Sequence, residues 1–223
     1  MKLNHLLPIT CIICRYNVAH KEFPVCADCL HHLQTLLTTE CRTCGRVPSA
    51  CTCPRSDNHR FAFFYGSPVS QGLIYLLKTD TDKRVMEFVA RLAVNACGLK
   101  PEAFDAVAYV PRSKKNLYFH GVDQARELAK AISAVYGIPA IDCIRRVGGK
   151  EQKLLSRDER MKNMKSSFVI KEDFHIEKPY KKILLVDDVY TTGATTKTCA
   201  SLLRGRVSDS VVVFTLAKTN FLK

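Results

Sequence analysis

The chain has 223 residues, of which 47% are hydrophobic and 25% charged, so it is long enough for one sizeable core or for a medium domain plus a small one. Its formal net charge is +13, which makes a polyanion such as DNA, RNA or a polyphosphate a candidate partner. The sequence has no run of about 18 apolar residues that would predict a membrane span. The opening MKLNHLLPITCIIC has no small-residue cleavage site of a signal peptide, so we expect a cytoplasmic protein.

Cysteine pairs dominate the first quarter of the chain. Eight of the eleven cysteines lie between residues 11 and 53, in three pairs with two intervening residues and one pair with a single intervening residue. Thiolates paired in this way supply the tetrahedral S₄ set that Zn²⁺ prefers. A disulfide framework fits poorly without an export signal, and redox chemistry does not explain four successive pairs. We predict two structural zinc ions held by Cys11, Cys14, Cys26, Cys29, Cys41, Cys44, Cys51 and Cys53.

The pairing of these cysteines stays open at the level of sequence. Sequential use, with the first four cysteines on one zinc and the last four on the other, is the simplest arrangement, and an interleaved arrangement is the alternative. Such a short segment builds little core, so metal binding would supply most of its folding energy. Because the cysteine pairs end near Pro54, we predict a double zinc-ribbon domain over residues 1–56 and a second domain over residues 57–223.

The second domain alternates strands with helices. Short apolar runs predict strands at residues 61–65, 105–110, 183–187 and 211–216. Helical patterns occupy residues 84–97, a stretch with Asp123 as its N-cap and Gly137 as its stop, and residues 195–204. This order predicts an α/β fold with a mostly parallel sheet flanked by helices.

Two adjacent carboxylates follow one of the apolar runs, in the stretch ILLVDDVYTTGAT at residues 183–195. Burying Asp187 and Asp188 would be costly, so we expect them at the carboxyl end of the strand, where α/β sheets bind ligands. Two carboxylates can accept hydrogen bonds from the vicinal hydroxyls of a sugar. The loop 191–195 offers backbone N–H groups, three threonine hydroxyls and a helix N-terminus, which suit a phosphate. The pattern therefore indicates a ribose 5-phosphate pocket, whereas an acidic turn followed by a threonine-rich cap would explain each half separately.

The same stretch closely resembles the 5-phosphoribosyl 1-diphosphate (PRPP) motif of type I phosphoribosyltransferases. The resemblance implies that Asp187 and Asp188 hold the ribose hydroxyls. It implies that the 5-phosphate lies against Thr191, Thr192, Gly193, Ala194 and Thr195. It also implies a pyrophosphate loop at Pro111, Arg112 and Ser113, and a Mg²⁺ ion that bridges the pyrophosphate and ribose oxygens.

Two further stretches resemble segments of ComF/GntX-type competence proteins. Residues 120–129, HGVDQARELA, are similar to the segment RGFNQAxxLA, with His120, Val122 and Asp123 at the differing positions. Residues 152–168, QKLLSRDERMKNMKSSF, match the segment QxxLSxxxRxxNxxxxF. With the cysteine pairs, the resemblance extends over essentially the whole chain. It implies a double zinc ribbon followed by a phosphoribosyltransferase-like domain.

Residues 145–165 carry eight basic and three acidic side chains. Because guanidinium groups suit bidentate phosphate contacts, Arg157 and Arg160, with the nearby Lys153, are candidates for contacting nucleic acid. The alternative for this segment is a basic helix with a solvated face.

The family resemblance implies a role in natural transformation, in which the protein handles incoming single-stranded DNA in the cytoplasm alongside other DNA-uptake proteins. PRPP or a related phosphoribose would be its small-molecule ligand. Two alternatives stay open. One is an active phosphoribosyltransferase, although no stretch of the sequence identifies the acceptor. The other is a PRPP-sensing regulator that keeps the pocket without catalysing transfer.

Overall fold

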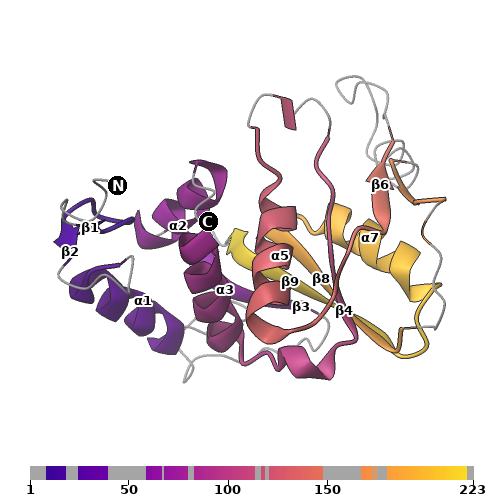
Figure 1. The fold of residues 1–223 in the computed structure, drawn as a ribbon, viewed down its shortest axis with the longest axis horizontal. Helices are drawn as coiled ribbons and strands as arrows, with labels where there is room; N and C mark the ends of the chain where they lie inside the picture. The colour runs from indigo at the N-terminus through magenta and orange to yellow at the C-terminus, as the bar shows by residue number, and fades with distance from the viewer. Residues whose placement is uncertain are drawn as a thin grey trace, which may run out of the picture.

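A computed structural model describes residues 9–18, 25–39, 59–66, 68–79, 83–113, 117–118, 121–147, 167–172, 174 and 180–219. Its centre is a sheet of five parallel strands in the order β3-β9-β8-β4-β5 (Figure 1). The strands are β3 (His59–Tyr65), β4 (Ala106–Tyr109), β5 (Ala140–Ile141), β8 (Lys182–Tyr190) and β9 (Ser210–Thr219). The predicted α/β fold with a mostly parallel sheet is therefore confirmed.

Helices cover both faces of this sheet. One face carries α2 (Pro68–Thr79), α3 (Lys83–Cys97) and α5 (Gln124–Tyr136), and the other carries α7 (Ala194–Arg204). A short 3₁₀ turn, η3 (Pro101–Ala103), connects α3 to β4. Alternate residues of β8 serve the two layers: Leu184 and Val186 pack in the cluster with α3 and α5, whereas Ile183 and Leu185 pack with α7. All four are fully buried, as expected for a parallel strand covered on both sides.

The predicted helix between Asp123 and Gly137 has the expected ends. The Asp123 side chain accepts a hydrogen bond from the Arg126 N–H, which is the usual N-cap contact. Gly137 ends the helix with a φ of 70°, a left-handed conformation that glycine adopts without strain.

The strand before the acidic pair is longer than predicted. We expected it to end at Asp187, but β8 continues to Tyr190 because β9 continues alongside it, pairing Asp187 with Thr215 and Tyr190 with Lys218. On its other side β8 loses its neighbour earlier, since the pairing with β4 ends at Tyr109 and Val186. The carboxylates thus lie inside β8, at the point where the sheet becomes open on one side.

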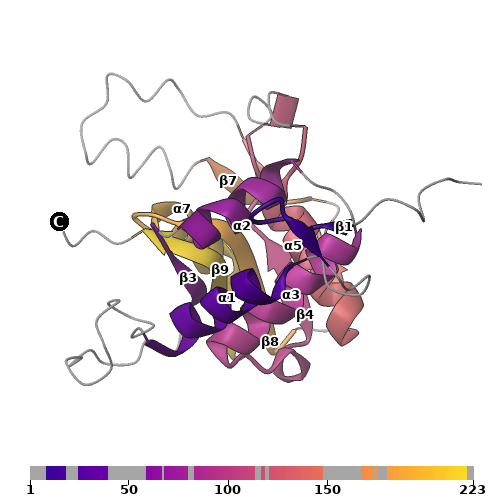
Figure 2. The same cartoon turned by 90° about the vertical axis from the view of Figure 1, so that its left-hand side faces the viewer.

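The N-terminal segment packs beside α2 (Figure 2). It contains a small antiparallel hairpin of β1 (Ile9–Thr10) and β2 (Asn17–Val18), followed by α1 (Ala27–Thr39). Leu33 of α1 is fully buried in the same cluster as Phe63 of β3 and Leu73 of α2. The predicted domain boundary between residues 56 and 57 lies outside the described residues.

A second antiparallel hairpin, of β6 (Ile144–Arg146) and β7 (Phe168–Ile170), stands beside the sheet. The candidate nucleic-acid contacts Lys153, Arg157 and Arg160 fall between these strands, outside the described residues. Within the described ranges, no helix has the length and apolar character needed to cross a bilayer.

Candidate functional site

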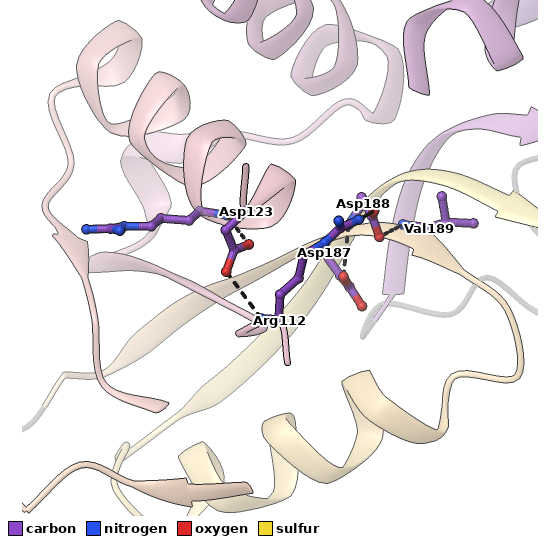
Figure 3. Close-up of polar contacts among 6 residues, drawn as sticks. Arg112, Asp123, Asp187, Asp188 and Val189 are labelled. Atoms are coloured by element: carbon purple, nitrogen blue, oxygen red, sulfur yellow. Dashed lines mark hydrogen bonds and ion pairs between the residues drawn. The ribbon is translucent and has the colours of Figure 1, made fainter. Parts of the chain in front are cut away.

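The acidic pair lies at the open side of β8, beside the loop that follows β4 (Figure 3). Both carboxylates are half-buried, and each accepts a hydrogen bond from the next backbone N–H. The Asp188 N–H donates to Asp187 Oδ1 at 2.9 Å, and the Val189 N–H donates to Asp188 Oδ1 at 2.7 Å. These bonds fix the orientation of both side chains.

Arg112 connects the β4 loop to this pair. Its Nη2 donates to Asp188 Oδ2 at 3.2 Å, and the two side chains are only 18% and 20% exposed. Two of the residues predicted to contact different parts of PRPP therefore touch each other. A ligand that takes both contacts must share or displace this ion pair.

Asp123 anchors the same loop from the start of α5. Its Oδ2 accepts from the Arg112 N–H at 3.2 Å, while its Oδ1 accepts from the Arg126 N–H at 3.2 Å. Burial raises the pKa of Asp123, although the two N–H groups favour its charged form. One carboxylate thus caps the helix and fixes the position of the predicted pyrophosphate loop.

Burial also raises the pKa of Asp187 well above its usual range, and the charge of the neighbouring Asp188 adds to this effect. An ionised Asp187 is therefore costly to the protein without a ligand. Hydroxyl donors or a cation at this position would relieve that cost, which makes Asp187 suited to a ligand that brings them.

The loop after β8 leads directly into α7. Gly193 is the N-cap of this helix and has a φ of 73°, so the N-cap residue offers no side-chain acceptor, and the Ala194 N–H donates to Thr192 Oγ1 at 3.4 Å instead. Thr191 and Thr192 are exposed, and Ala194 and Thr195 are half-buried. A helix N-terminus beside threonine hydroxyls has the chemistry that suits an anion of phosphate size.

Two stacked aromatic rings, Tyr190 and His59, lie next to this loop. The Tyr190 ring lies against Gly193 so closely that a Cβ on residue 193 would overlap it. The Tyr190 ring also stacks on the His59 ring, with ring centroids 4.0 Å apart. His59 Nε2 lies 3.1 Å from Thr215 Oγ1, and burial together with Lys218 lowers the pKa of His59 to about 4. The imidazole is therefore neutral at physiological pH and acts as packing beneath the loop.

The N-terminal segment brings four cysteines together. The Sγ atoms of Cys11, Cys14, Cys26 and Cys29 lie within 4.8 Å of one another, and those of Cys14 and Cys26 are 3.6 Å apart. A tetrahedral zinc site with Zn–S bonds of about 2.3 Å places its sulfurs about 3.8 Å apart. The cluster is therefore positioned to bind a metal ion. Cys41, Cys44, Cys51 and Cys53 lie outside the described residues.

Comparison with known proteins places the chain in a family. It is 30% identical over 211 residues to competence protein F of Haemophilus influenzae, covering 89% of this chain and 86% of that protein. The chain belongs to the ComF family of competence proteins. This ComF-family chain is also 27% identical over 192 residues to competence protein ComFC of Streptococcus pneumoniae, with 86% and 80% of the two chains covered. A comparison with models of protein families finds no match.

Among solved structures, the ComF-family chain is similar to the glutamine PRPP amidotransferase of B. subtilis, with 17% identity and a TM-score of 0.39. The matched region covers 60% of this chain and only 25% of that enzyme. A similarity of this size carries no statement about activity.

Sequence reasoning for this ComF-family chain named most of the residues that the structure brings together. The acidic pair and the loop 191–195 are continuous in sequence, and Arg112, in the loop after β4, contacts Asp188. It missed the anchoring role of Asp123 and the stack of His59 beneath Tyr190. The sequence pattern marks Asp123 only as a helix cap and as a departure from the family segment, and no local signal connects His59 to a residue more than a hundred positions away.

Proposed function

We propose that this ComF-family chain acts in natural transformation, where it handles single-stranded DNA in the cytoplasm and binds PRPP or a related phosphoribose. The observation that carries the proposal is the adjacency of the acidic pair and the Gly193 loop at the open side of β8. The names of the two relatives add the competence context.

The proposed ligand contacts follow from the chemistry of each group. Asp187 and Asp188 would accept hydrogen bonds from the ribose hydroxyls and hold a Mg²⁺ ion that accompanies PRPP. The loop 191–195 would hold the 5-phosphate against the first turn of α7. Pro111, Arg112 and Ser113 would face the pyrophosphate, which carries the negative charge that the Arg112 guanidinium prefers.

For the N-terminal segment we propose a zinc ion on Cys11, Cys14, Cys26 and Cys29, and a second on Cys41, Cys44, Cys51 and Cys53. Closed S₄ sites have no open coordination position, so both ions would be structural. Residues 1–56 would form the zinc-ribbon domain and residues 57–223 the phosphoribosyltransferase-like domain. Lys153, Arg157 and Arg160 remain proposed DNA contacts.

The proposal is tested in cells that lack this chain. Transformation by external DNA should fall and return with the wild-type chain, but not with Asp187→Asn/Asp188→Asn. As a matched control, Asp209→Asn changes an exposed carboxylate outside the site and should restore transformation fully. Full restoration by the site variant would show that transformation does not depend on the phosphoribose pocket.

Catalysis is the second candidate, because an acidic pair with an arginine partner could bind PRPP in a reactive position. Release of pyrophosphate from PRPP in the presence of nitrogenous acceptors distinguishes it from binding alone. Turnover that disappears in Asp187→Asn/Asp188→Asn would establish a transferase. Tight PRPP binding without pyrophosphate release would favour a PRPP-sensing or DNA-handling role.

A further inference from the structure

A pocket lies against the loop that follows β4, and two of the residues proposed to face the pyrophosphate, Pro111 and Arg112, line it. Its volume is about 580 Å³, and it lies between the β4 loop, the first turn of α5 and the β6 hairpin. This size is typical of small-molecule sites. Arg112 lines this pocket while its guanidinium contacts Asp188, so the pocket adjoins the proposed phosphoribose site.

The lining of the pocket is predominantly cationic. Five basic and three acidic residues line it, and the basic ones are Arg112, Arg126, Arg145, Arg146 and Lys171. The carboxylates already have donors: Asp123 accepts two backbone N–H groups, Glu127 pairs with Lys130 at 2.9 Å, and Asp142 pairs with Lys171 at 2.7 Å.

Three arginines are therefore the groups available to an anion. The Arg146 guanidinium lies over the Phe168 ring, 5.3 Å from its centroid, which holds it in place without neutralising it. Arg145 lies 3.8 Å from Glu172, a side chain that is 95% exposed, so their pairing is weak. Arg126 projects from the first turn of α5 and is exposed. A guanidinium group can form bidentate hydrogen bonds with a phosphate.

One of the lining residues is followed in the chain by an exposed aromatic residue. Leu117 lines the pocket, and the neighbouring Tyr118 is 87% exposed. Backbone hydrogen bonds tie this segment to both sides: the Leu117 N–H donates to the Ser113 carbonyl at 2.9 Å, and the Gly121 N–H donates to the Leu117 carbonyl at 2.8 Å. Figure 1 shows the segment rising above the start of α5, with β6 standing to its right. Exposed aromatic rings and arginines are the groups that bind the bases and phosphates of a single strand.

We infer that this pocket binds a nucleotide unit, with its phosphate on Arg126, Arg145 and Arg146 and its base against Leu117 and Tyr118. The inference rests on the proposed function and gives the DNA a site among the described residues. It differs from the contacts proposed from sequence, because it uses the start of the basic stretch 145–165 and an arginine of α5. The unit could be a free nucleotide or part of a DNA strand, since both present the same phosphate and base.

The test uses the full-length zinc-loaded chain, a fluorescein-labelled oligo-dT strand and dTMP. Arg126→Gln/Arg146→Gln should weaken binding of the strand roughly tenfold and reduce the slope of log affinity against log salt by about 1. The matched control, Arg204→Gln/Arg206→Gln, removes the same charge from two exposed arginines outside the pocket and should change affinity less than twofold. Thermal melting checks that both variants fold.

A second variant tests the base contact. Tyr118→Ala should weaken the strand several-fold and leave the affinity for inorganic pyrophosphate unchanged, because that ligand has no base. Binding of dTMP as well as the strand identifies a nucleotide-sized ligand, and binding of the strand alone identifies DNA. Both results support the inference.

Equal weakening by the pocket variant and its control would overturn the inference, because long-range charge alone would then explain the binding. Normal PRPP binding together with this result would leave the phosphoribose proposal intact. If the wild-type chain bound neither dTMP nor the strand, the inference and the DNA-handling part of the proposed function would both fail.

Discussion

Replacing Arg112 by methionine removes the cation that holds Asp188 while keeping the backbone N–H that donates to Asp123. A charge-assisted hydrogen bond contributes about 1.5–3 kcal/mol when shielded, whereas an exposed ion pair contributes about 0–1 kcal/mol. The Arg112 and Asp188 side chains are 18% and 20% exposed, so they resemble the shielded case more closely. We expect Arg112→Met to lower the free energy of unfolding by about 2 kcal/mol.

Urea denaturation at pH 7 measures this loss, and a double-mutant cycle with Asp188→Asn isolates the pair. The coupling free energy between the two changes should be about 1–2 kcal/mol. The control is Lys83→Met, which removes the cation of a pair with Glu87 whose side chains are 82% and 31% exposed. That change should alter the free energy of unfolding by less than about 0.5 kcal/mol. A coupling energy near zero between residues 112 and 188 would show that the ion pair does not stabilise the folded chain.

Three further predictions follow from the site and the metal centre. Because the pKa of Asp187 is raised in the folded chain, its ionisation destabilises the fold as the pH rises from the unfolded value near 3.8 to the folded value. Asp187→Asn should therefore be more stable than the wild type at pH 7 and lose this advantage below pH 3.8. A difference in urea midpoints that does not change with pH would contradict this prediction. Gly193→Ala should cost about 1–2 kcal/mol for its φ of 73°, with a further cost from displacing Tyr190, whereas Gly205→Ala, with an ordinary φ of −72°, should change the melting temperature little. Metal analysis should find two zinc ions per chain, one fewer in Cys29→Ser and no fewer in Cys97→Ser, which lies outside the cysteine cluster; an unchanged zinc content in Cys29→Ser would contradict the assignment of the first site.

The sequence was sufficient for features that depend on local pattern. Continuous apolar runs predicted the parallel strands β3, β4, β8 and β9, because such strands are buried on both faces. The stretch at residues 183–195 likewise predicted that two carboxylates and a phosphate-sized loop would be neighbours, since they are consecutive in the chain.

Features that depend on long-range packing could not be predicted. The extra length of β8 comes from its pairing with β9, and nothing local in ILLVDDVY indicates where that pairing ends. The contact between Arg112 and Asp188 joins residues 76 positions apart, so it required the fold. The arginines that line the proposed nucleotide pocket likewise come from three separate segments, the β4 loop, α5 and β6. The sequence indicated only the basic stretch 145–165, which contains two of these arginines.

The measurement that tests the account most directly is a calorimetric titration of the full-length chain with PRPP and Mg²⁺. The account predicts saturable binding by the wild type and by the control Asp209→Asn, and at least a roughly tenfold weaker affinity in Asp187→Asn/Asp188→Asn, because the ribose hydroxyls lose two charged acceptors. Equal affinities for the wild type and the double variant, or no heat of binding from the wild type, would contradict the claim that β8 carries a phosphoribose site.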